Sequence, residues 1–112
     1  MRGKSVFVFI VALIATRSCF ALGVEELRKG LNQALTDKGS STSQLAAYVT
    51  GYIHGSAEYA RTLGLVCDES GLRSTHDELN AVHAYIDANP DQWADGAQLL
   101  INRALISPKC NH

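Results

Sequence analysis

The sequence predicts an all-α protein: a small bundle of about four helices with one disulfide. After Ala21, apolar residues recur at helical spacing in four separate segments. The same region has no run of β-branched or aromatic residues alternating with polar ones between turn signals, which a strand would show. Cys67 and Cys110 are the two cysteines that follow Ala21, and they form an even pair.

Residues 1–21 have the three parts of a cleavable secretory signal. A basic start precedes an uncharged, mostly apolar run over residues 5–15, and Cys19-Phe20-Ala21 puts small residues three and one before the expected cut. The run is far shorter than the roughly 20 residues of a membrane span, which disfavours an uncleaved anchor. We therefore expect residues 22–112 to be exported as one domain.

The first expected helix runs from about Val24 to Leu35. Its leucines recur on one stripe, and Glu25 and Glu26 lie in the first turn, where the helix dipole favours negative charge. The serine-rich stretch over residues 39–43 is typical of a loop that leads into another helix.

The second expected helix, from about Ser43 to Leu63, is the longest. Beside its apolar face lies a second stripe of small residues, Ala47, Gly51 and Gly55. A glycine inside a helix costs about 1 kcal/mol relative to alanine. We therefore expect another helix to pack closely against Gly51 and Gly55, because close approach is the usual compensation for that cost.

The third expected helix begins at Thr75, because Thr75-His76-Asp77-Glu78 fits a capping box with the threonine as N-cap. Asn89-Pro90 ends it, since the residue before a proline is disfavoured in the helical conformation. The same dipeptide is expected to begin a fourth helix that ends at Pro108. The wide apolar arc of this fourth helix places it centrally in the domain or against a second subunit.

Cys67 and Cys110 would most simply form a disulfide in an oxidising compartment. In the chain-entropy model such a bond contributes about 4 kcal/mol. The alternative is a reactive thiol pair, but the sequence has no Cys-x-x-Cys.

The charge of the mature chain limits its partners. Three of the ten basic residues precede the expected cut and all eleven acidic residues follow it, which leaves a net charge of −4. We therefore expect no nucleic-acid partner and no membrane association after signal cleavage, whereas a basic protein partner is favoured.

The candidate chemical groups are few. His54 and Glu58 are four residues apart and share a helix face, but two ligands are too few for a zinc site, so we expect no metal and no cofactor. His76 and His83 share a face of the third helix; His83 lies on the apolar stripe as a core or interface histidine, with pH sensing as the alternative. The sequence shows no nucleophile elbow and no phosphate-binding glycine loop, so we do not expect an enzyme.

Five pieces of sequence carry a family resemblance. They are Gly51-Tyr52-Ile53-His54-Gly55, Cys67 with a short glycine-containing loop, Val82–Pro90, Ala97–Leu105, and Pro108-Lys109-Cys110. In order and spacing, behind a signal peptide, they resemble the amidase-immunity proteins of type VI secretion, the Rap/Tai family. The resemblance implies a helical, often dimeric periplasmic protein that binds a peptidoglycan amidase from a neighbouring cell and blocks its active site. It also supports the pairing of Cys67 with Cys110.

Two functions therefore compete. The first is an immunity protein that inhibits its cognate peptidoglycan amidase toxin, through an acidic surface set against a basic cleft. The alternative is a small periplasmic acid-stress chaperone, which would expose apolar surface at low pH. For each acid that would contact the amidase, the competing explanation is that it only caps a helix or keeps the protein soluble. The acids expected to be most available to a partner are Asp68, Glu69, Asp77, Asp87 and Asp91.

Overall fold

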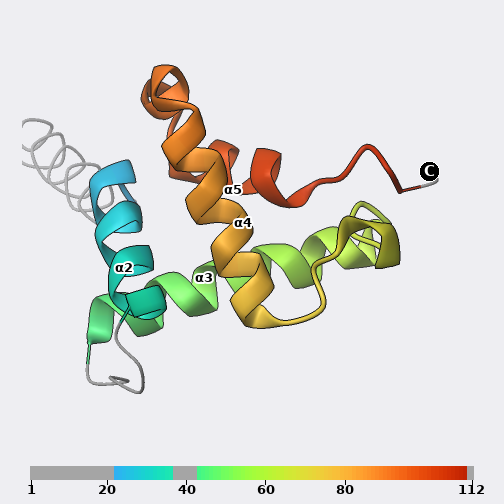
Figure 1. Ribbon diagram of the computed structural model, residues 1–112, viewed down its shortest axis with the longest axis horizontal. Coiled ribbons are helices and arrows are strands. Elements are labelled where there is room, and N and C mark those ends of the chain that lie inside the picture. Colours follow the sequence, from blue (N-terminus) through green and yellow to red (C-terminus); the bar gives the residue numbers. More distant parts are fainter. Residues whose placement is uncertain (1–21, 37–42, 111–112) are drawn as a thin grey trace, which may run out of the picture.

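Four α-helices and two short 3₁₀ helices form the part of the protein that the computed structural model describes, residues 22–36 and 43–110 (Figure 1). These residues contain no strand, so the all-α prediction is confirmed. The expected signal peptide and most of the serine-rich loop lie outside the described residues. The elements are α2 (Val24–Thr36), α3 (Gln44–Thr62), η1 (Asp68–Ser70), α4 (Thr75–Ala88), η2 (Pro90–Asp95) and α5 (Ala97–Leu105).

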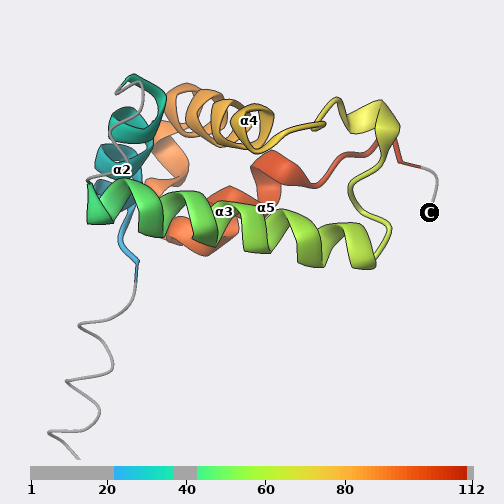
Figure 2. The ribbon, with the colours of Figure 1, turned by 90° about the horizontal axis from the view of Figure 1, so that it is seen from below.

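The long helix α3 runs along one side of the molecule, α4 lies on the other side, and α5 lies between them (Figure 2). Helix α2 closes one end by packing against both α3 and α4, while α5 contacts α3, α4 and η2. None of the helices in the described ranges is both long enough and apolar enough to cross a membrane.

The apolar stripes of the four helices meet in one core, as their periodicity predicts. Leu27 and Leu31 of α2 are completely buried, and so are Val49 and Ile53 of α3. Helix α5 is central, with its buried face turned towards both long helices. The core consists of Leu27, Leu31, Val49, Ile53, Ala57, Leu79, Val82, Ile86, Ala97, Leu100, Ile101 and Leu105.

The start of α4 differs from the predicted capping box. Ser74, rather than Thr75, is the N-cap, and its hydroxyl oxygen accepts a hydrogen bond from the Asp77 N–H at 3.1 Å. Thr75 is the first helical residue. Glu78 therefore does not cap the helix, and its side chain instead turns into the protein, where it is 1% exposed.

The expected fourth helix is divided in two. Gly96 separates η2 from α5 with φ 98° and ψ 157°, a backbone conformation that is almost confined to glycine. Before this break, the Trp93 indole N–H donates to the Ile86 carbonyl oxygen at 3.0 Å and holds η2 against the end of α4. Asn89 does not cap η2 with its side chain, whose amide donates to the Tyr85 carbonyl oxygen at 2.8 Å.

The predicted close packing at Gly51 and Gly55 is wrong for the single chain. Both glycines are exposed on α3, and a Cβ atom at either position would meet nothing within 4 Å. The close helix contact occurs at Gly30 of α2 instead. There a Cβ atom would lie 2.9 Å from Val49 Cβ and 3.1 Å from the Leu45 carbonyl oxygen.

Alanine at these glycines should therefore change stability in opposite directions. Gly51→Ala or Gly55→Ala should raise the free energy of unfolding by about 0.5–1 kcal/mol, because alanine is the better helix former and its methyl group meets open space. Gly30→Ala should lower it by about 1–2 kcal/mol through overpacking of the α2–α3 contact. Urea unfolding of the three variants measures both the expected gain and the expected loss in the free energy of unfolding. A loss of stability in Gly51→Ala would show that another chain covers this face, as in the expected homodimer.

Candidate functional site

The connection between α3 and α4, residues 65–74, is fixed to the rest of the protein at three points; we call it the tethered connection. The predicted disulfide is present between Cys67 and Cys110, whose Cα atoms lie 5.7 Å apart. The Ser107 N–H donates to the Leu65 carbonyl oxygen at 3.2 Å. At the other end, Arg61 Nη2 donates to the Leu72 carbonyl oxygen at 2.9 Å. The connection is therefore held by α3 on one side and by the tail after α5 on the other.

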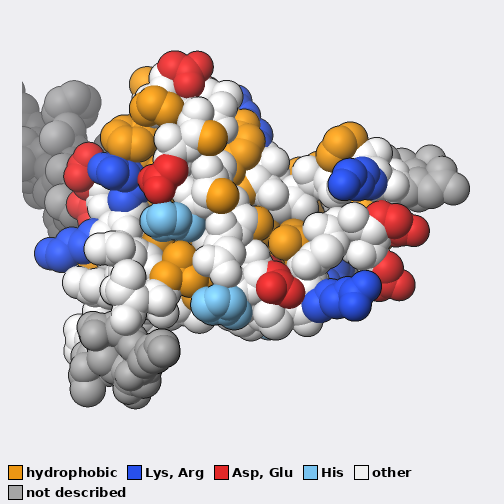
Figure 3. Space-filling model, in the orientation of Figure 1, with side chains coloured by type: hydrophobic (Ala, Val, Ile, Leu, Met, Phe, Trp, Pro, Cys, Tyr) orange, Lys and Arg blue, Asp and Glu red, His pale blue; other side chains and the backbone are white. Residues whose placement is uncertain are grey.

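The middle of the tethered connection is the short helix η1. The Ser70 hydroxyl oxygen accepts a hydrogen bond from the Cys67 N–H at 3.1 Å, and Gly71 ends the turn with φ 74°. Asp68 and Glu69 of η1 are exposed. In both ribbon views η1 lies at the end of the molecule opposite α2 (Figures 1 and 2). Charged side chains of both signs gather over this end (Figure 3).

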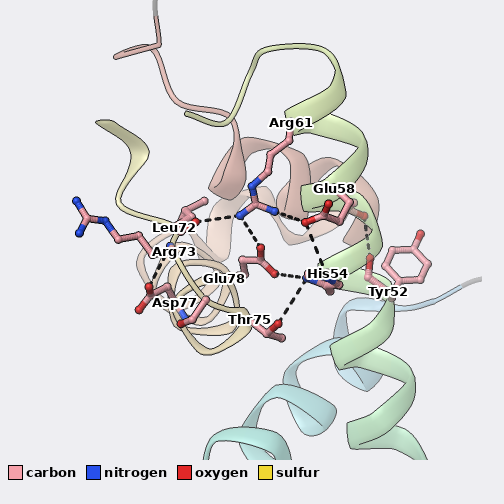
Figure 4. Close-up of polar contacts among 11 residues, drawn as sticks. Tyr52, His54, Glu58, Arg61, Leu72, Arg73, Thr75, Asp77 and Glu78 are labelled. Carbon is pink, nitrogen blue, oxygen red and sulfur yellow. Dashed lines mark hydrogen bonds and ion pairs between the residues drawn. The ribbon is translucent and has the colours of Figure 1, made fainter. Parts of the chain in front are cut away.

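A polar cluster joins α3 to α4 beneath the tethered connection (Figure 4). Its centre is the buried Glu78 carboxylate, both of whose oxygens have partners. His54 Nδ1 lies 2.9 Å from Oε1, and Arg61 Nη2 donates to Oε2 at 2.9 Å. Burying a carboxylate is costly unless it is paired and hydrogen-bonded, and these two contacts meet that requirement.

Glu58 completes the cluster from the exposed side of α3. Its Oε1 atom accepts a hydrogen bond from Arg61 Nη1 and lies 3.9 Å from His54 Nε2. The hydrogen bond to Glu78 is the main cause that raises the pKa of Arg61 above its ordinary value, so this guanidinium stays charged. We call His54, Glu58, Arg61 and Glu78 the Glu78 cluster.

The Glu78 cluster and the tethered connection share one cleft, with a volume of about 520 Å³. His54, Glu58 and Arg61 contribute to its lining from α3, while Asp68 and Arg73 contribute from the tethered connection. The cleft therefore offers carboxylates, an imidazole and guanidinium groups at one place on the surface.

The five acids expected to face a partner do not form one surface. Asp68 and Glu69 lie exposed on η1. Asp77 is partly buried at the start of α4, where its Oδ2 atom accepts a hydrogen bond from the Arg73 N–H at 3.1 Å. Asp87 and Asp91 are exposed at the other end of α4 and on η2, away from η1 (Figure 1). The acids at the α4–η2 end therefore cannot belong to the same small contact as those of η1.

His83 is not a core histidine, although it lies on the predicted apolar stripe of α4. Its side chain is 39% exposed, and its Nε2 atom lies 3.6 Å from Asp87 Oδ2. It lines a second cleft, between α2 and α4, together with Arg28, whose guanidinium carbon lies 4.3 Å from the centre of the Trp93 ring. This side of α4 is therefore a solvated polar groove.

Sequence reasoning missed Arg61 and Glu78, and it counted only two possible metal ligands near His54. A signal was present in the spacing. Glu78 precedes the buried Val82 by four residues and Arg61 follows the buried Ala57 by four, so both charged residues occupy positions on the apolar stripes. Opposite charges at inward-facing positions of two helices indicate a buried pair.

Comparison with known proteins gave no matching family model, no matching curated protein and no matching solved structure. The resemblance to the Rap/Tai family therefore stays a prediction.

Proposed function

We propose that this protein is a periplasmic immunity protein, which binds a peptidoglycan amidase delivered by type VI secretion and blocks its active site without doing chemistry itself. The observation that supports this function is the tethered connection. It lies at one end of the molecule, it is fixed at three points, and it presents exposed charged side chains. An element of this kind can enter the cleft of a folded partner.

Fixing the tethered connection before binding favours tight inhibition. A flexible loop loses backbone conformational entropy when it binds, at about 1–2 kcal/mol for each residue that becomes fixed. The disulfide and the hydrogen bonds to the Leu65 and Leu72 carbonyl oxygens remove much of that cost in advance. Asp68 and Glu69 then add attraction to a basic cleft, which speeds encounter and makes the association rate sensitive to salt.

Protection of living cells is the direct test of this proposal. Cells that express a periplasm-targeted amidase from the same genome should lyse, and co-expression of this protein should prevent lysis. Removal of residues 1–21 should abolish protection, because the inhibitor would no longer reach the compartment of the toxin. Protection that is independent of residues 1–21 would contradict the periplasmic part of the proposal.

Charge reversal tests the contact surface with the purified amidase. The double variant Asp68→Lys/Glu69→Lys should weaken binding by at least about tenfold, mainly through slower association, because both charges lie on the proposed contact. The double variant Asp87→Lys/Asp91→Lys is the matched control, since it changes the net charge by the same amount at exposed acids of the α4–η2 end and should leave the affinity unchanged. Surface plasmon resonance at two salt concentrations measures both effects. Equal losses in the two variants would show that net charge, rather than η1, drives binding.

The chaperone alternative gives a different set of results. Under that hypothesis, no amidase from the same genome binds, and the protein prevents aggregation of unrelated proteins at acid pH. Light scattering of a denatured client protein, with and without this chain, measures that activity. This pair of results would replace the immunity function by the chaperone function.

A further inference from the structure

The Glu78 cluster brings together side chains of the types that bind divalent transition-metal ions in proteins. One ligand atom each from His54, Glu58 and Glu78 lies within 4.8 Å of the other two. Zinc binds imidazole nitrogen and carboxylate oxygen at about 2.0–2.2 Å, which places two ligands of a tetrahedral ion about 3.4 Å apart. The largest closure required between two ligand atoms is therefore about 1.4 Å.

The side chains that would have to move towards the ion, His54 and Glu58, are exposed enough to do so. Those of His54 and Glu58 are 46% and 57% exposed, and they project from consecutive turns of α3. Glu78, by contrast, is 1% exposed, and Arg61 holds its Oε2 atom. The site thus has one rigid buried ligand on α4 and two adaptable ligands on α3.

Arg61 contacts one oxygen of each carboxylate and not the other. It contacts Oε2 of Glu78 and Oε1 of Glu58, so each carboxylate keeps a second oxygen that Arg61 does not hold. The cluster has two carboxylates and one guanidinium, so it attracts a cation rather than an anion. Hydrogen-bonded partners behind metal-ligating carboxylates orient those ligands, and Arg61 is placed to do this for both.

We propose that His54, Glu58 and Glu78 form a binding site for a divalent transition-metal ion of the zinc class, with Arg61 as the positioning residue for the two carboxylates. The mixed nitrogen and oxygen ligands select zinc, copper or nickel over magnesium or calcium, which prefer oxygen alone. Three protein ligands leave one coordination position of a tetrahedral ion open to water or to another group in the cleft.

Isothermal titration calorimetry of the untagged chain with Zn²⁺ tests the site. We expect saturable binding of one ion per chain, and no comparable binding of Mg²⁺. His54→Ala should weaken Zn²⁺ binding by at least about tenfold, because it removes the only nitrogen ligand. His83→Ala is the matched control. His83 and Asp87 form the other exposed pair four residues apart, and within the described residues no third ligand group joins them.

Separate variants test the two carboxylate ligands, Glu78 from α4 and Glu58 from α3. Glu78→Gln should weaken Zn²⁺ binding by at least about tenfold, provided that circular dichroism shows the chain to be folded. Glu58→Gln, at an exposed position, tests a carboxylate ligand without disturbing the buried pair. Absence of saturable Zn²⁺ binding would overturn the proposal. So would undiminished affinity in His54→Ala, an equal loss in His83→Ala, or Mg²⁺ binding as tight as that of Zn²⁺.

Discussion

Serine in place of Cys110 should lower the free energy of unfolding by about 2–5 kcal/mol, the usual cost of removing a native disulfide from a small domain. Cys67 and Cys110 are 43 positions apart, so their bond excludes many open conformations of the unfolded chain. Small domains have a total stability of roughly 5–15 kcal/mol, so the bond supplies a large share. Its loss would also remove the covalent bond between the tethered connection and the tail after α5.

Thermal unfolding with and without a reductant measures this effect. In a domain of this size each kcal/mol lowers the melting temperature by about 4–8 °C. Cys67→Ser, Cys110→Ser and the reduced wild-type protein should melt at similar temperatures, because each lacks the same bond. Ser70→Ala is the control; it removes a hydroxyl 3.3 Å from Cys110 Sγ and keeps the disulfide. Complete thiol labelling of the native protein would contradict the prediction.

Methionine in place of Arg61 should destabilise the protein by about 3 kcal/mol, because it leaves the buried Glu78 carboxylate without its guanidinium partner. His54, 2.9 Å from Glu78, stays in place and limits the loss. Arg61→Lys should recover only part of the stability. A single ammonium group cannot replace the planar guanidinium that contacts Glu58, Glu78 and the Leu72 carbonyl oxygen together.

Two further variants distinguish the cost of leaving a buried charge unpaired from the cost of losing any ion pair. Arg61→Met/Glu78→Met removes both partners and should be more stable than Arg61→Met alone, because no unpaired charge is left in the interior. Arg103→Met breaks the exposed pair with Asp95, in which Nη1 and Oδ2 lie 2.7 Å apart, and should cost less than about 1 kcal/mol. Urea unfolding of the four variants compares them. An Arg103→Met loss equal to that of Arg61→Met would argue against the burial explanation.

The sequence by itself determined the helices and most of their inward-facing residues. Leu27 and Leu31 lie on the stripe of leucines that the sequence predicts for the first helix, and both are completely buried. The disulfide was predicted correctly because the mature chain has two cysteines, Cys67 and Cys110. Periodicity and residue counts are local or compositional properties, so the printed sequence carries them in full.

Only the tertiary structure decided where helices approach one another and which polar residues are buried. The close contact falls at Gly30 rather than at Gly51, because the crossing of α2 over α3 depends on how the two helices pack. Glu78 fits a capping box in sequence, yet Ser74 caps the helix and Glu78 meets His54 and Arg61 from α3. Spacing along the chain reports which face of a helix turns inward, but the groups that it meets there come from other helices, whose placement is fixed only when the core packs.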